Sequence, residues 1–295
     1  MALERDFFEF IYRRQVVWYR RFFLKEKPPW TKDDVLQKYK FCNVYRELDK
    51  GTAYIIDTLR HIRNRKKILL NVVFYRFFNK HLLYEALNIK PFSVFDTALE
   101  EALRKKMIAL QKQGKTLFND AYLIAGKQGE PKYLSVLQSV FFVGAHGDRI
   151  ICELDHARIP YESLQAIKKI PLVGNFLAYE IWTDLTYFAF FKQKWTDDDF
   201  VNIGPGAVWG LEIIFQEKLS RKKQMEKIAY LHKKQKEVLP ALSHQYAWAH
   251  ISFKEALSNR PFLSLRNIEH ALCEFRKYWN LSHGRGKKRK FYPIL

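Results

Sequence analysis

One stretch of the chain, residues 164–178, reads LQAIKKIPLVGNFLA and is the most informative part of the sequence about the fold. Apolar side chains recur at every third position from Leu164 onward, which is the spacing of one helix face. Pro171 ends this pattern, because it lacks the backbone N–H that a helix interior needs. A second apolar pattern begins at Phe176, so two helices joined by a short turn are predicted near 161–185. This arrangement is typical of a helix-hairpin-helix unit.

The turn between these helices is expected to bind an anion. A glycine there allows the backbone to approach a phosphate closely, and the N–H groups that open the second helix carry the positive end of its dipole. Such contacts hold the DNA backbone without reading its base sequence. An ordinary helical turn is the alternative. The residues expected to contact DNA here are Lys168, Lys169, Val173, Gly174 and Asn175.

The remainder of the chain also has a helical pattern. Its 295 residues include only 12 Gly and 10 Pro, and no strand pattern or internal repeat interrupts the helical spacing of apolar residues. We therefore expect an all-α fold, organised as one domain over 1–295. Helices are predicted at 6–25, at 31–49 behind a capping pair of Thr31 and Asp34, and at 52–63, 68–78, 94–113, 131–142, 161–184, 206–232 and 267–278.

The charge of the chain indicates a polyanionic partner. Its 51 Lys and Arg residues exceed its 31 Asp and Glu residues and give a formal net charge of +20. Such an excess of positive charge favours binding to nucleic acid, because each phosphate that a basic side chain neutralises releases counterions. Scattered charge for solubility is the alternative. The basic tail at 283–295 is expected either to grip phosphates or to be a solvated end; its candidate DNA contacts are Arg285, Lys287, Lys288 and Arg289.

Several classes of protein and site are excluded by what the sequence lacks. No apolar run approaches the roughly 18 residues of a membrane helix, and the acidic start is unlike a secretion signal, so a cytoplasmic protein without a membrane partner is expected. Cys42, Cys152 and Cys273 show no metal-site spacing. Ala109 stands where a phosphate-binding loop ending at Thr116 has its first glycine. No metal, cofactor or kinase loop is expected.

Three carboxylates are candidate catalytic groups. Glu180 and Asp184 stand four residues apart on the second hairpin helix, so both can face one pocket; a solvated helix edge is the alternative. Asp199 ends a run of three aspartates, where it can stabilise positive charge or accept a proton. In the alternative interpretation, Thr196 caps a helix and the aspartates complement its first turn.

Two further segments are candidate binding sites. The turn Gly204-Pro205-Gly206 opens a predicted helix and is expected either to cradle an anion or simply to turn tightly. Asn43, Arg46 and Asp49 recur every third position, and Tyr45 beside them can stack on an extruded base. These four residues form the predicted substrate pocket. An Arg46–Asp49 salt bridge and a core aromatic are the alternatives.

Six blocks of the sequence, taken together and in this order, resemble one known family. They are PWTKD at 29–33, FCNVYRELD at 41–49, FNDAYLI at 118–124, the hairpin, GPGA at 204–207 and EHALCEF at 269–275. The chain is similar to the α-glutamyl/putrescinyl thymine pyrophosphorylases of phage and bacterial DNA hypermodification. That family is also known by the helical domain of the 5-hydroxymethyluracil DNA kinases. The resemblance extends from about Phe8 to Tyr292.

The resemblance implies a fold like that of the helix-hairpin-helix DNA glycosylases. It implies double-stranded DNA with a modified thymine as the partner, an amino acid or polyamine as co-substrate, and a 5-hydroxymethyluracil DNA kinase as a further partner. Members are thought to replace a phosphate or pyrophosphate on the thymine 5-methyl group by an amine. The base that deprotonates this amine would be Asp199, Glu180 or Asp184.

One position departs from the glycosylase pattern. Phe176 stands where bifunctional members have a nucleophilic lysine, which argues against a Schiff-base lyase. A monofunctional DNA glycosylase and a non-catalytic DNA-binding partner of the kinase remain alternative hypotheses.

Overall fold

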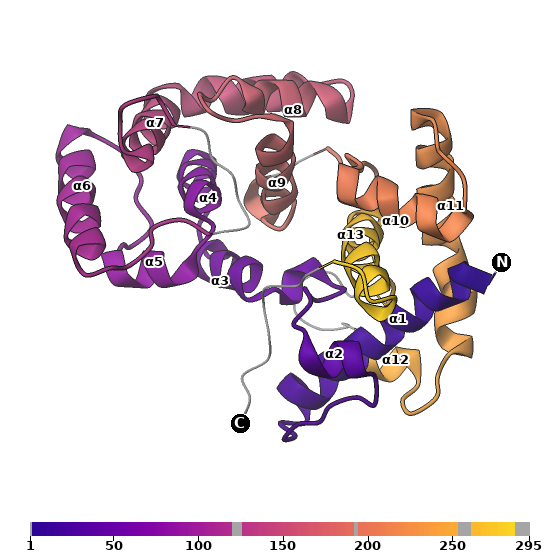
Figure 1. Ribbon diagram of the computed structural model, residues 1–295. Coiled ribbons are helices and arrows are strands. Elements are labelled where there is room, and N and C mark those ends of the chain that lie inside the picture. The colour runs from indigo at the N-terminus through magenta and orange to yellow at the C-terminus, as the bar shows by residue number, and fades with distance from the viewer. Residues whose placement is uncertain (1, 120–125, 192–193, 253–260, 287–295) are drawn as a thin grey trace. The chain divides into compact units, whose positions relative to one another are not determined.

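The computed structural model describes residues 2–119, 126–191, 194–252 and 261–286, and every regular element in these ranges is helical (Figure 1). The prediction of an all-α fold is confirmed for this part of the chain. None of the helices described combines the length and the apolar composition of a membrane span. The α-helices are α1 (Ala2–Trp18), α2 (Asp34–Lys38), α3 (Lys50–Leu59), α4 (Arg65–Phe78), α5 (His81–Leu87), α6 (Thr97–Lys112), α7 (Lys132–His156), α8 (Pro160–Lys168), α9 (Asn175–Thr186), α10 (Pro205–Phe215), α11 (Arg221–Ala241), α12 (Trp248–Ile251) and α13 (Leu265–Ser282). A π-helical segment lies at Tyr19–Phe23, and 3-10 turns lie at Arg46–Leu48 and Ala189–Phe191.

The chain divides into two compact units. Unit 1 consists of Met1–Asp49 and Asp197–Leu295, and unit 2 of Lys50–Thr196. Both ends of the chain therefore build unit 1, and unit 2 is inserted between them. The single domain expected over 1–295 stays a prediction.

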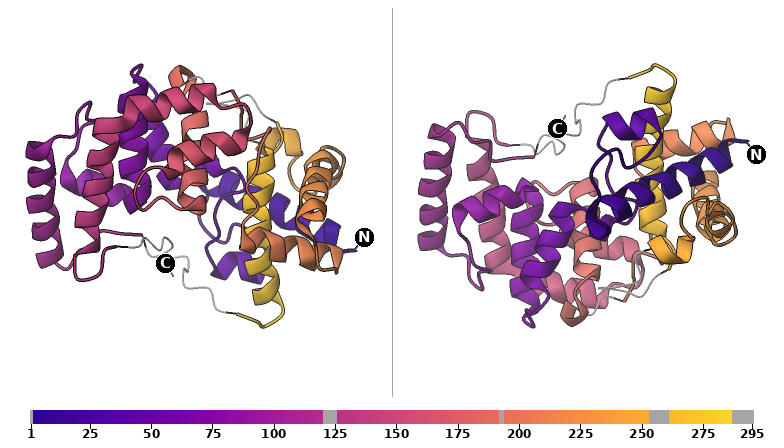
Figure 2. Two further views of the ribbon diagram at one scale, coloured as in Figure 1. Left: turned by 90° about the horizontal axis from the view of Figure 1, so that it is seen from above. Right: turned by 90° about the horizontal axis from the view of Figure 1, so that it is seen from below.

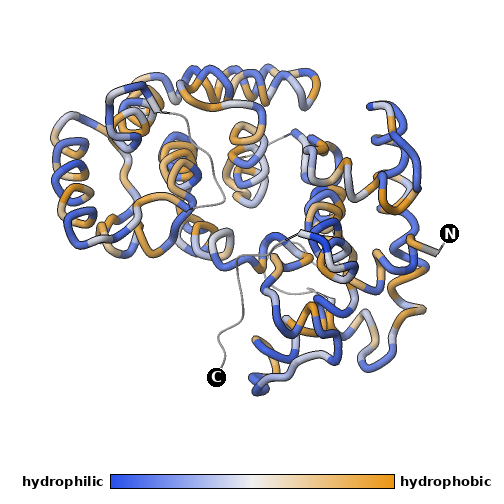
Figure 3. The backbone as a smooth tube through the Cα atoms, viewed as in Figure 1, coloured by the Kyte–Doolittle hydropathy of each residue, from blue (hydrophilic) through white to orange (hydrophobic). Residues whose placement is uncertain are grey.

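Unit 2 is built around α4. Every residue from Ile68 to Phe78 is buried, and α4 packs against α7 and α9, as Figure 1 shows. By contrast, α6 buries one face through Leu103, Met107 and Leu110, and Figure 3 shows apolar and polar residues alternating along it. A helix buried on all sides must pair its polar groups, and α4 carries Arg76 into the interior of unit 2.

Unit 1 joins the first helix to the last ones. α1 packs against α10, α11 and α13, and Figures 1 and 2 agree that α1 lies beside α13. α10 and α13 approach closely because α10 has glycines at the contact. An added Cβ on Gly210 would overlap the backbone carbonyl of Leu272, and one on Gly206 would overlap the sulfur of Cys273.

Two of the segments predicted as one continuous helix are interrupted. The helix predicted over 31–49 ends at Lys38, and beyond it only the turn Arg46–Leu48 is helical. The helix predicted over 206–232 is two helices, because Gln216 adopts the left-handed conformation (φ 54°) at the end of α10.

Candidate functional site

Two helices, α8 and α9, joined by a turn at 169–174, lie where the hairpin is predicted. Gly174 caps α9 in extended backbone (φ −86°, ψ −178°), which any residue can adopt, and Leu172 takes the left-handed conformation instead (φ 65°). What Gly174 provides is space, because an added Cβ would meet nothing within 4 Å. Gly174 and Asn175 are exposed, and Val173 is buried. The backbone at the start of α9 is therefore open to a ligand.

The two lysines beside this turn differ in their surroundings. Lys168 ends α8 and is half-buried. Lys169 Nζ lies 2.7 Å from Glu153 Oε2 on α7, in an exposed ion pair that offsets part of its charge.

Glu180 and Asp184 lie together around a buried arginine. Arg76 on α4 donates from Nε to Asp184 Oδ2 and from Nη2 to Asp184 Oδ1 at 2.6 Å, and its Nη1 lies 3.6 Å from Glu180 Oε2. Thr52 and Asn79 accept further hydrogen bonds from the same guanidinium. Asp184 is 0% exposed and Glu180 is 4% exposed, so the alternative of a solvated helix edge is wrong.

The run of aspartates anchors the start of α13. The backbone carbonyl of Asp197 accepts a hydrogen bond from the N–H of Arg266 (3.0 Å), and Asp198 Oδ1 accepts one from the N–H of Leu265 (3.2 Å). These contacts satisfy N–H groups that the first turn of a helix leaves without partners.

No helix begins at this run. Residues 197–199 form a turn and α10 begins only at Pro205, so the interpretation of Thr196 as a helix cap is wrong. Asp199 is exposed and belongs to unit 1. The other two candidate carboxylates belong to unit 2.

The four residues predicted to form the substrate pocket lie in a loop of unit 1 and its short 3-10 turn, not on one face of an α-helix. The N–H of Asn43 donates to Asp49 Oδ1 (2.8 Å), and Arg14 on α1 donates to Asn43 Oδ1 (2.7 Å). The N–H of Arg46 donates to Asn267 Oδ1 on α13 (3.0 Å). The structure thus brings Asn43 and Asp49 together through the loop.

Tyr45 is a core residue. It is 2% exposed, its ring stacks on Trp248 (centroids 6.3 Å apart), and its hydroxyl donates to the carbonyl of Pro261 (3.3 Å). Its ring is therefore covered, which favours the core-aromatic alternative.

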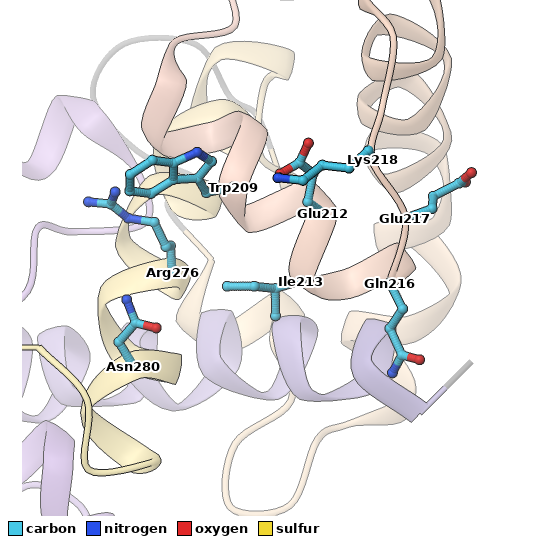
Figure 4. Close-up of a pocket in the computed structure, with 8 residues that line it drawn as sticks. All are labelled: Trp209, Glu212, Ile213, Gln216, Glu217, Lys218, Arg276 and Asn280. Carbon is cyan, nitrogen blue, oxygen red and sulfur yellow. The ribbon is translucent and has the colours of Figure 1, made fainter.

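An exposed aromatic, Trp209 on α10, borders an open hollow in unit 1 (Figure 4). The guanidinium of Arg276 on α13 lies 4.8 Å from the centre of its ring, and Figure 4 shows the two side by side. An indole beside a guanidinium is a surface on which a nucleobase can stack. The hollow is also lined by Glu212, Ile213, Gln216, Glu217, Lys218 and Asn280.

The Gly204-Pro205-Gly206 turn meets a carboxylate of the protein itself. The N–H of Gly204 donates to Glu269 Oε1 on α13 (3.2 Å), and Glu269 also pairs with Arg266. These contacts favour the tight-turn alternative. Of the basic tail, Arg285 is exposed, while Lys287, Lys288 and Arg289 lie outside the described residues.

α13 also faces the loop that precedes α3. The N–H of Cys42 donates to Glu274 Oε2 (3.0 Å), and His270 Nε2 lies 3.5 Å from Asp49 Oδ2. The potential ligand atoms of Cys42, Asp49 and His270 all lie within 4.8 Å of one another. Sequence reasoning misses Cys42 and His270, because they lie near opposite ends of the chain. The sequence feature that could have pointed to them is that both residues fall in blocks that carry the family resemblance.

Two side chains of α13, Cys273 and Lys277, have pKa values above their usual ones. Burial raises the pKa of the Cys273 thiol. Burial acts to lower the pKa of Lys277, but the Glu274 carboxylate and the nearby Cys273 and Cys42 together outweigh it, so the pKa of Lys277 lies above its usual value. At neutral pH this part of α13 therefore carries a protonated thiol and an ammonium.

Comparison with known proteins identifies a family and a relative. The model of the family described as "5-hmdU DNA kinase, helical domain" matches residues 2–288. A protein of Bacillus phage SP10 named 5-hmdU DNA kinase is 29% identical over 291 residues, which cover 90% of this chain and 43% of the phage protein. The chain thus spans less than half the length of that relative. No solved structure matches it.

Proposed function

Because the chain belongs to the family of 5-hmdU DNA kinase helical domains, we propose that it is a DNA-modifying transferase that acts on a derivative of 5-hydroxymethyluracil. The family match over residues 2–288 carries this proposal, since it covers segments of both units. The net charge of +20 supports a DNA partner. Its place of action would be the cytoplasm, where DNA is available.

The proposed reaction exchanges a phosphate-type group for an amine. The base is first turned out of the double helix. The bond between the 5-methylene carbon and the ester oxygen breaks, and the phosphate or pyrophosphate leaves with the electron pair. The amine nitrogen of an amino acid or polyamine forms the new bond to that carbon and gives up a proton to a carboxylate.

The surroundings of the three carboxylates suggest different roles. Asp184 accepts two hydrogen bonds from Arg76 and is fully buried, so we assign it to positioning that arginine. Glu180 shares the same arginine through a longer contact, and Asp199 is exposed. Glu180 and Asp199 are therefore the proposed proton acceptors.

The proposed DNA contacts centre on the hairpin. The exposed backbone at Gly174 and Asn175 would bind a phosphate at the dipole end of α9, with Lys168 adding charge. The basic tail would add further phosphate contacts, and an exposed aromatic such as Trp209 would stack on a base. A kinase that phosphorylates the hydroxymethyl group would supply the substrate.

The test is nucleoside mass spectrometry on DNA that contains phosphorylated 5-hydroxymethyluracil. The DNA is incubated with the protein and a mixture of amino acids and polyamines. A nucleoside that has lost the phosphate and gained an amine supports the transferase and identifies its donor. Release of the free base would contradict it and indicate a glycosylase. Glu180→Gln and Asp199→Asn should each reduce product formation if that side chain accepts the proton.

A second candidate is a DNA-binding partner of a kinase with no reaction of its own. It is favoured by the ion pairs that occupy Glu180 and Asp184 inside unit 2. In that case the mass spectrum stays unchanged, while the protein still binds DNA and the Glu180→Gln and Asp199→Asn variants bind equally well.

A further inference from the structure

Three side chains of unit 1 converge into a set of potential metal ligands. Cys42 lies in the loop after α2, Asp49 immediately precedes α3, and His270 lies on the second turn of α13. Their ligand atoms all lie within 4.8 Å of one another. Ligand atoms around a tetrahedral zinc ion are about 3.5 Å apart, and His270 Nε2 already lies 3.5 Å from Asp49 Oδ2.

Other contacts orient this set. The N–H of Asn43 donates to Asp49 Oδ1 at 2.8 Å, which turns the other carboxylate oxygen toward His270. The N–H of Cys42 donates to Glu274 Oε2 at 3.0 Å, which fixes the backbone of the cysteine against α13. Metal ligands in proteins are commonly held by such outer hydrogen bonds.

The histidine supplies the second observation. The Nε2 atom of His270 is buried and makes no hydrogen bond within the described residues, although it lies 3.5 Å from Asp49 Oδ2. A buried ring nitrogen normally has a partner, and a neutral imidazole nitrogen beside a carboxylate and a thiol is a ligand for a cation. A thiolate and a carboxylate together would balance the charge of a divalent ion.

We propose that Cys42, Asp49 and His270 bind a divalent cation of the zinc class. Thiolate and imidazole favour zinc over magnesium or calcium, which prefer oxygen ligands. Three protein ligands leave a fourth position for water or for an oxygen of a bound molecule, as in catalytic zinc sites. This proposal is independent of the amine-transfer function, because it concerns binding of the ion alone.

The test is titration with Co²⁺ in the absence of DNA, followed by displacement with Zn²⁺. It uses the full chain with Cys152→Ser, because the exposed Cys152 and His156 on α7 (Sγ to Nδ1 3.5 Å) offer a competing pair of ligands. We expect one equivalent of Co²⁺ to produce sulfur-to-cobalt charge-transfer absorption that Zn²⁺ removes. Cys42→Ser should abolish this absorption, and Asp49→Asn and His270→Gln should each weaken binding at least about tenfold.

Two further measurements separate loss of a ligand from loss of the fold. Asp49→Asn retains an oxygen that can accept the Asn43 hydrogen bond, so its circular dichroism should match that of the parent. Cys273→Ser, on the same helix as His270, is the matched control and should retain the cobalt absorption. Zn²⁺ should also slow alkylation of Cys42 but not of Cys273. Absence of the cobalt absorption, or binding that Asp49→Asn and His270→Gln leave unchanged, would overturn the proposal.

Discussion

At the scale of single residues, burial decides what a charge can do. Arg76 lies inside unit 2 beside two carboxylates, and these carboxylates are the charged partners that compensate its buried charge. Removing one member of such a cluster leaves an uncompensated charge in a medium that solvates it poorly. An ion pair between the same groups at the surface is solvated by water and contributes little to the free energy of unfolding.

This contrast gives a stability prediction. Asp184→Ala should lower the free energy of unfolding by about 3–5 kcal/mol, because it leaves Arg76 buried without its two-bond partner. Asp155 accepts hydrogen bonds from Arg65 at 2.7 and 2.8 Å but is largely exposed. Asp155→Ala should therefore cost less than about 1 kcal/mol. Urea denaturation measures both, and equal losses would contradict the structural role of the buried cluster.

His81 gives a prediction about pH. Burial, helped by the nearby charge of Lys50 and opposed by Glu85, holds the pKa of His81 below its usual value. The unfolded chain therefore takes up this proton first as the pH falls through about 6.5. The free energy of unfolding should decrease across that interval and level off below the lowered pKa. His81→Asn should make this pH dependence of the free energy of unfolding shallower. If the variant and the parent have identical pH profiles, the dependence arises from groups other than His81.

At the scale of elements, local sequence patterns predict the presence of a helix better than they predict the residues at which it begins and ends. The helix predicted over 94–113 corresponds to α6, whose buried residues repeat at helical spacing. The helix predicted over 131–142 is too short, because α7 continues to His156. Gly144 and Gly147 lie inside α7, where they make room for Phe95 and Lys66. Such a contact is not visible in the local sequence.

Glycines in two elements should respond differently to alanine. Gly210→Ala on α10 should lower the free energy of unfolding by about 1–3 kcal/mol, because its Cβ meets the backbone of Leu272. Gly174→Ala at the hairpin should have little effect on stability, since open space surrounds its Cβ. Thermal denaturation compares the two. A large loss with Gly174→Ala would mean that the turn is packed more tightly than described.

At the scale of the whole molecule, net charge rather than any one contact should set the affinity for the DNA partner that we propose. If about six phosphates are neutralised, affinity for a duplex of arbitrary sequence should fall about a thousandfold between about 50 and 200 mM salt. Fluorescence anisotropy measures this dependence. A chain ending at Ser282 lacks the basic tail and should show a shallower dependence, and an unchanged one would remove the tail from the interface.

The sequence predicts most of the helices and the proximity of the two carboxylates on α9, because both follow from the spacing of residues along one segment. It did not reach Arg76, which meets those carboxylates from α4, nor the meeting of Cys42 with His270. Such long-range contacts leave no local spacing. Sequence reasoning also placed Tyr45 within the helix predicted over 31–49, whereas Tyr45 precedes a 3-10 turn and its ring stacks on Trp248 of α12.

The division of unit 1 between the two ends of the chain has a consequence for biosynthesis. The buried side chains of α1 include Phe7, Phe8 and Phe10, and their partners on α10 and α13 are translated only after unit 2. At about 5–20 residues per second, the ribosome needs roughly 10–50 s to proceed from the end of the first segment to the end of α13. During that interval we expect the aromatic face of α1 to lack its native cover and to be a target for chaperones, while unit 2, which is continuous in sequence, folds on the nascent chain.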